Sequence, residues 1–158
     1  MLAIADTDFR SLESFPLSWR WRHDSSSPIP ADVRGVIRCL SESKATEFGG
    51  LVRPHVAADR FSSHDFSTVT SLDPTSDVAG SRSWLRSLPV SSSTTVVVSW
   101  DPDTALLIPW PAFVDYWDDF CYPSSDDLVV APFDLRWLLA FWHFERFDFA
   151  ECASPAAA

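Results

Sequence analysis

Basic residues are few in this chain, and one long stretch of it has none. The 158 residues include twelve lysines and arginines, of which Lys44 is the single lysine, and positions 87–135 contain neither type. The formal net charge is -10 at pH 7. Because a nucleic-acid backbone or an anionic membrane is bound through Lys and Arg, we expect neither as a ligand. The balance favours a cationic partner, in the first place a basic protein and in the second a metal ion.

Cysteine, glycine and long apolar runs are also scarce. The three cysteines, Cys39, Cys121 and Cys152, are widely spaced without a CxxC pair, which is typical of a reducing compartment. With four glycines the chain has neither of the common phosphate-binding loops, and it lacks a GxSxG nucleophile motif. No apolar run reaches the about 18 residues of a membrane span, and the first residues lack a signal-peptide pattern. The sequence therefore predicts a cytoplasmic protein.

Apolar and aromatic residues are plentiful. Hydrophobic residues make up 46% of the chain and aromatic residues 14%, with eight tryptophans, which suffices for a sizeable core. The length fits one domain. We predict a single domain over residues 1–152 and a flexible tail over residues 153–158.

The first half has the pattern of helices and loops. Pro30 presets a helix start at Ala31, and Ser41 is a suitable N-cap for a second helix that Gly49-Gly50 would stop. Alternation of Leu17, Trp19 and Trp21 predicts a short strand. The expected order is a helix over 9–15, a strand over 17–22, a helix from 31 with helical spacing to 40, a helix to 48, a loop over 54–75 and a helix over 77–88.

The second half predicts a ββαββ unit. A β-branched run over 94–100 predicts a strand. The turn sequence Asp101-Pro102-Asp103 and a second strand over 104–108 complete a hairpin. Residues 110–121 have one apolar and one acidic face, as an amphipathic helix has. Further strands are expected over 127–131 and 137–144. The fold class is therefore α+β: a small antiparallel sheet packed with helices from the N-terminal half.

The stretch without basic residues carries eight aspartates: Asp101, Asp103, Asp115, Asp118, Asp119, Asp126, Asp127 and Asp134. A merely soluble face normally mixes both signs, so an acid-only surface favours a contact with a basic partner. The expected partner-binding residues are Asp115, Tyr116, Asp118, Asp119, Tyr122, Asp126 and Asp127. A solvated helix face with a turn is the alternative, and an acid/base pair or cation site is a third.

A few other residues are candidates for chemistry or contact. His143 and Glu145, two apart on an expected strand, could form an acid/base pair or part of a metal site, or simply hydrogen-bond at the sheet edge. Cys121 lies on the apolar helix face and fits the core. Trp137 and Trp142 are candidates for an exposed tryptophan, which beside carboxylates would be an interface anchor. We assign no catalytic, cofactor-binding or metal-binding residue.

Two segments resemble a known family. Trp19-x-Trp21-x-His23, followed by Pro28-Ile29-Pro30 and a helix, is similar to the opening of a family of small uncharacterised bacterial proteins. The run 94–98, the pattern Trp110-x-x-Phe113-x-x-x-Trp117-x-x-Phe120 and Asp126-Asp127 resemble that family's C-terminal half.

The chain as a whole also resembles the small acidic immunity proteins encoded beside polymorphic toxins of contact-dependent and type VI secretion systems. That resemblance implies a non-enzymatic cytoplasmic protein, a monomer or weak dimer without cofactor, that binds a cognate toxin domain and blocks its active site. Two alternatives stay open. One is a non-catalytic regulatory or scaffold module, and the other is a small metal-dependent hydrolase using His143, Glu145 and a nearby aspartate.

Overall fold

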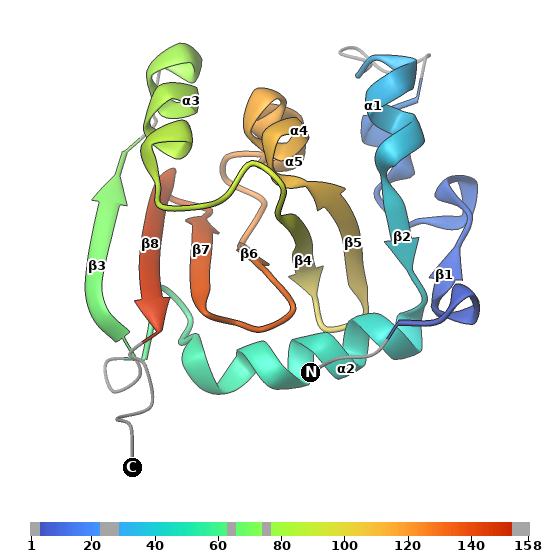
Figure 1. Ribbon diagram of the computed structural model, residues 1–158, viewed down its shortest axis with the longest axis horizontal. Coiled ribbons are helices and arrows are strands. Elements are labelled where there is room, and N and C mark those ends of the chain that lie inside the picture. Colours follow the sequence, from blue (N-terminus) through green and yellow to red (C-terminus); the bar gives the residue numbers. More distant parts are fainter. Residues whose placement is uncertain (1–3, 23–28, 63–65, 74–76, 153–158) are drawn as a thin grey trace.

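The chain forms a single α+β domain built on one antiparallel sheet of eight strands, in the order β1-β2-β5-β4-β6-β7-β8-β3. The computed structural model (Figure 1) describes residues 4–22, 29–62, 66–73 and 77–152. The strands are β1 Phe9–Arg10, β2 Arg38–Leu40, β3 Phe66–Leu72, β4 Thr95–Asp101, β5 Thr104–Pro109, β6 Leu128–Ala131, β7 Trp137–Trp142 and β8 Arg146–Cys152. The helices are α1 Ala31–Val36, α2 Glu42–Val52, α3 Val78–Ser87, α4 Trp110–Asp115 and α5 Trp117–Phe120. The predicted α+β class is confirmed, and the predicted tail lies outside the described residues.

Both faces of the sheet are covered. Figure 1 shows α2 crossing one end of the strands, with α1, α3 and α4 at the other end. Alternate residues of β4 enter two separate apolar clusters: Val97 packs with α2, whereas Val96 and Val98 pack with α3, α4 and α5. Because β6 and β7 are covered on both sides, every one of their residues is buried, and their sequences read as continuous apolar runs.

The predicted helix cap at Ser41 is confirmed, and the structure shows a second cap at Asp77. The Ser41 hydroxyl accepts a hydrogen bond from the Lys44 backbone N–H at 3.3 Å, and the Asp77 carboxylate accepts one from the Gly80 N–H at 2.7 Å. The predicted stop at Gly49-Gly50 is wrong, because α2 continues to Val52. A Cβ atom at position 49 would lie 3.2 Å from the Pro102 carbonyl oxygen. Gly49 therefore lets α2 lie close against the β4–β5 turn.

The prediction of the first 40 residues is largely wrong. Residues 9–15 form β1 and a 3-10 turn in place of a helix, and the strand expected over 17–22 contains a 3-10 turn at Ser18–Arg20. The helix from Ala31 starts as predicted but ends at Val36, after which β2 pairs with β1 and β5. Hydrogen bonds to distant strands override the local periodicity here, as tertiary contacts commonly do.

The second half agrees better. The β4–β5 hairpin is confirmed, and the apolar helix face, including Cys121, is buried. The expected helix over 110–121 is divided at Tyr116 into α4 and α5. Strand β7 ends at Trp142, and β8 was not expected at all. The loop prediction over 54–75 is wrong for β3, which pairs with β8.

Candidate partner-binding surface

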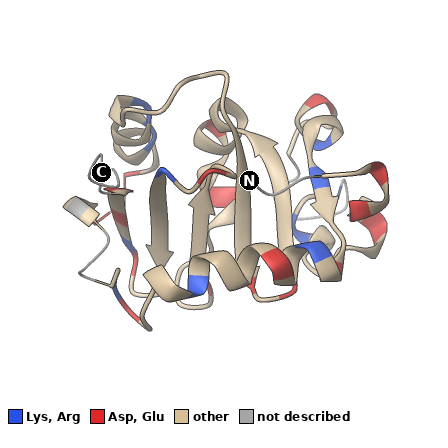
Figure 2. Cartoon of the chain, turned by 60° about the horizontal axis from the view of Figure 1, so that its bottom comes forward, with Lys and Arg blue, Asp and Glu red and all other residues tan. Residues whose placement is uncertain are grey.

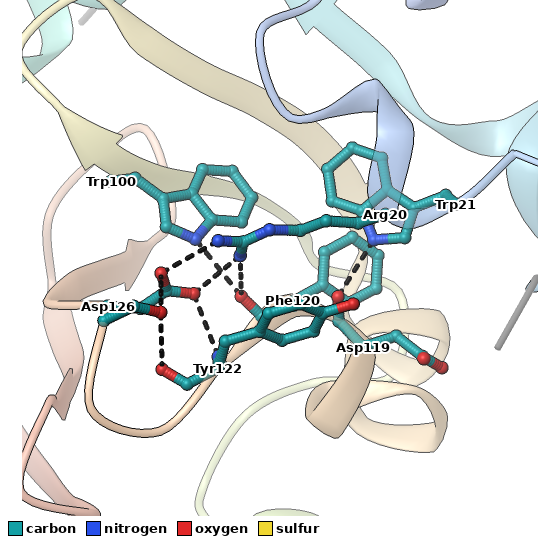
Figure 3. Close-up of polar contacts among 8 residues, drawn as sticks. Arg20, Trp21, Trp100, Asp119, Phe120, Tyr122 and Asp126 are labelled. Atoms are coloured by element: carbon teal, nitrogen blue, oxygen red, sulfur yellow. Dashed lines mark hydrogen bonds and ion pairs between the residues drawn. The ribbon is translucent and has the colours of Figure 1, made fainter. Parts of the chain in front are cut away.

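A buried ion pair joins the N-terminal segment to the chain that follows α5 (Figure 3). The Arg20 guanidinium donates two hydrogen bonds to the Asp126 carboxylate, from Nη1 to Oδ2 at 2.6 Å and from Nη2 to Oδ1 at 2.9 Å. The two side chains are only 5% and 6% exposed. The carboxylate also accepts bonds from the Tyr122 backbone N–H at 2.9 Å and the Ser125 hydroxyl at 3.1 Å. This bidentate geometry is the strongest form of such a contact.

The surroundings of Asp126 favour its charged form. Burial would raise the pKa of this carboxyl, but the hydrogen bonds from Arg20 and from the Tyr122 N–H, with the Arg20 charge, outweigh burial and hold the pKa below its ordinary value of 3.8. The pair is therefore ionised at neutral pH.

The same N-terminal segment and β4 donate hydrogen bonds to backbone carbonyls at the end of α5. The Trp21 indole N–H donates to the Asp119 carbonyl at 2.9 Å. The Trp100 indole N–H and Arg20 Nη1 donate to the Phe120 carbonyl at 3.1 and 3.5 Å. The last carbonyls of a helix have no partner within the helix. Here distant side chains supply the partners and fix the orientation of α5.

An exposed tryptophan lies over this buried pair. Trp19 is 51% exposed, and its ring packs edge-to-face on Tyr122, with the ring centroids 6.0 Å apart. The Arg20 guanidinium contacts both rings, at 4.2 Å from the Tyr122 centroid and 5.4 Å from the Trp19 centroid. Neighbouring Trp21 is fully buried, because successive residues of the 3-10 turn point in different directions.

The charges of two α5 carboxylates, Asp118 and Asp119, act on the Tyr122 phenol. Asp118 is exposed and Asp119 is half-buried. Burial raises the pKa of the Tyr122 phenol against the opposing charge of Arg20, and the negative charges of Asp119, Asp126 and Asp118 add to the rise. We call the group Trp19, Asp118, Asp119 and Tyr122 the Trp19 surface. It places an aromatic anchor beside negative charge.

The predicted acid-only surface does not exist as one patch. Folding brings cations from outside positions 87–135: Arg20 binds Asp126, Arg86 binds Asp115, and Arg136 lies 3.7 Å from Asp134. The His143 Nδ1 atom lies 3.0 Å from Asp127. In the view of Figure 2 acidic and basic positions are interspersed. The expectation that Asp126 lies on the surface is wrong, since its carboxylate is buried by the contact with Arg20.

The other predicted residues divide between different places. Asp127 lines a hollow of about 420 Å³ together with Gly49 and Val52 of α2, the helix that covers the other face of the sheet. Tyr116 is half-buried against the core on the α4 side. Asp118, Asp119 and Tyr122 are the predicted residues that the structure brings together.

The sequence reasoning missed Trp19 and Arg20. It expected the exposed tryptophan at Trp137 or Trp142, and both are buried in β7. Trp19 belongs to a Trp-Arg-Trp run whose alternation predicts a strand, and this pattern does not indicate which of the two tryptophans is exposed.

The residues considered for enzyme chemistry lie in a turn. His143 and Glu145 follow β7 in place of sharing a strand face, and Glu145 has a φ of 64°. The His143 backbone N–H and ring both contact the Asp127 carboxylate. Among the described residues, no group of three His, Cys, Asp or Glu side chains could hold a metal ion.

Within the described part of the chain, every helix is too short or too polar to cross a membrane. The chain was compared with protein-family models, with curated protein sequences and with solved structures, and none of them matches.

Proposed function

We propose that this chain is a cytoplasmic immunity protein that binds a basic toxin domain through the Trp19 surface and blocks its active site. The observation that carries the proposal is an exposed tryptophan that packs on Tyr122 and on the guanidinium of a buried ion pair, where the charges of Asp118 and Asp119 act on the Tyr122 phenol. A large exposed aromatic residue is the type that most often dominates the binding energy of protein interfaces.

The fixed orientation matters for affinity. A side chain that is already ordered before binding loses less conformational entropy on binding. Trp19 is ordered by Tyr122 and Arg20, and Arg20 is in turn held by Asp126. A rigid anchor of this kind suits an inhibitor that must remain bound to its target.

The charge of the chain supports a basic target. A net charge of -10 attracts cationic partners and repels acidic ones, which speeds encounter and suppresses wrong partners. A nuclease-like or nucleotide-binding cleft is basic because it holds phosphate. A regulatory module with another basic partner would use the same surface, and the identity of the partner separates the two.

The direct test is co-expression with the neighbouring reading frame. If that frame encodes a toxin, its expression alone should stop growth, and this chain should restore growth and co-purify with the toxin. A toxin that still kills in the presence of this chain, or that fails to co-purify, would refute the immunity role.

Charge reversal at Asp118 tests the electrostatic part. Asp118→Lys is expected to slow association with the partner by roughly three- to tenfold at low salt, because steering falls when attractive charge is removed. The dependence of the association rate on salt should weaken as well. Stopped-flow or surface plasmon resonance at several salt concentrations measures both.

Asp59→Lys is the matched control, because it makes the same charge change at another exposed aspartate, 61% exposed. It should alter the association rate less than Asp118→Lys. Equal effects of the two variants would mean that net charge alone steers the encounter and would remove Asp118 from the binding surface.

A further inference from the structure

Strand β3 is an open edge of the sheet. It is the last strand in the sheet order and pairs with β8 on one side, and Figure 1 shows no described element beyond it. It has seven residues, whereas the opposite edge strand, β1, has two, one of them Arg10. Edge strands are usually kept short or protected by charge or proline, because their free backbone groups pair readily with another strand. The sequence of β3, Phe-Ser-Thr-Val-Thr-Ser-Leu, contains neither charge nor proline.

The centre of the strand is apolar and exposed. Val69 is 48% exposed and lies opposite Ala150, which belongs to the cluster on the α2 side. Thr68, Thr70 and Ser71 are exposed beside it. A second strand placed along this edge would cover Val69 and would pair with the backbone groups that point away from β8, where the described residues supply no further strand.

The sequence of β3 reads almost the same in both directions. Around Val69 stand Thr68 and Thr70, then two serines, then the apolar residues Phe66 and Leu72. In an antiparallel pair of identical strands with Val69 on the two-fold axis, each residue would face one of its own kind. Self-complementarity of this sort is what a two-fold interface requires, and Val–Val and Thr–Thr pairs stabilise neighbouring strands.

We propose that two copies of this chain pair antiparallel through β3, with Val69 facing its counterpart, and so join their sheets edge to edge. Charge also favours pairing at this edge over other surfaces. Each copy carries a net charge of -10, but β3 contains no carboxylate that would face a carboxylate of the second copy. Because two copies with this charge repel each other, association should strengthen with salt, which screens the repulsion.

The dimer should be weak. One strand pair falls at the low end of interface sizes, below about 1,200 Å². The register of β3 against β8 shifts between Phe66 and Val69, which bends that half of the strand. The tightest pairing is therefore expected at the centre. The interface does not include the Trp19 surface, so its test is independent of the proposed function.

Sedimentation velocity of the full chain, from about 10 µM to about 1 mM at low and high salt, measures the association. A sedimentation coefficient that rises with concentration, more steeply at high salt, supports the proposal. A chain that stays monomeric over this range overturns it, even if β3 binds a strand of another protein.

A charge swap tests the register. Val69→Lys and Val69→Glu should each weaken the dimer at least about tenfold, since like charges would face each other. An equimolar mixture of the two should dimerise again, because opposite charges then meet. Val36→Lys changes another exposed valine, 44% exposed and on α1, and should leave the dimer unchanged.

The remaining outcomes contradict the proposal. Dimerisation of both single variants as in the wild type would place the interface elsewhere, and failure of the mixture to associate would exclude the two-fold register. Amide exchange at positions 68–70 of the wild type, expected to slow as concentration rises, answers the same question without a substitution.

Discussion

Replacement of Asp126 by alanine is expected to destabilise the fold by about 3–5 kcal/mol, because it leaves the buried Arg20 guanidinium without its carboxylate. The two side chains are 5% and 6% exposed, so water cannot replace the lost partner without opening the structure. A loss of this size is a large fraction of the about 5–15 kcal/mol that stabilises a typical domain. Urea unfolding followed by tryptophan fluorescence measures it.

Asp115→Ala is the matched control. It breaks the ion pair between Asp115 and Arg86, whose side chains are 45% and 60% exposed, and exposed pairs contribute at most about 1 kcal/mol. Equal free energies of unfolding for the two alanine variants would show that the Arg20–Asp126 pair does not stabilise the fold as described. Arg20→Leu combined with Asp126→Leu should recover part of the loss, since no unpaired charge remains buried.

The Arg20–Asp126 pair also makes the stability of the fold depend on pH. The pKa of Asp126 is lower in the folded state than its ordinary value of 3.8. Its contribution to stability is therefore fully present above that value and is lost as pH falls through the folded pKa. Unfolding of Asp126→Asn should accordingly depend less on pH in this acidic range than unfolding of the wild type.

Replacement of Trp19 by alanine is expected to weaken binding to the partner by at least roughly 30-fold, the effect of about 2 kcal/mol at an interface hot spot. The stability of the chain should change far less, because Trp19 is 51% exposed. Isothermal titration calorimetry with the partner, alongside urea unfolding of the free protein, separates the two effects.

Phe144→Ala provides a close comparison for Trp19. Phe144 is also exposed, at 44%, and also has a guanidinium over its ring, that of Arg146 at 5.0 Å. It lies outside the Trp19 surface and should affect binding little. A Trp19→Ala variant that binds as tightly as the wild type would refute the assignment of the surface, and so would an equal loss with Phe144→Ala.

Local patterns in the sequence predicted the parts of the fold that local interactions determine. The cap at Ser41, the β4–β5 hairpin and the apolar face of 110–121 depend on residues within a few positions of each other, and all are confirmed. Strand β3 was missed because its residues are mostly polar and exposed, so neither periodicity nor apolar content marks it. Strand β2 was missed because its apolar residues also fit a continuation of α1.

The candidate site was harder to predict because its parts are far apart in the sequence. Arg20 and Asp126 are 106 residues apart, and no local pattern tells which arginine will neutralise which aspartate. The absence of basic residues from 87–135 therefore suggested an acid-only surface that folding does not produce. Of the predicted residues, Asp118, Asp119 and Tyr122 lie together in the structure. Trp19, from a segment predicted to be a strand, packs on Tyr122.

The sheet order has a consequence for synthesis of the protein on the ribosome. Strand β3 pairs with β8, which is the last strand to be synthesised. Strand β2 pairs with β5, which is also synthesised much later than β2. The emerging chain must carry unpaired strands until position 152 has been translated, and exposed strands of this kind aggregate readily. Folding is therefore expected to finish late and slowly, as it does when many contacts join distant parts of a chain.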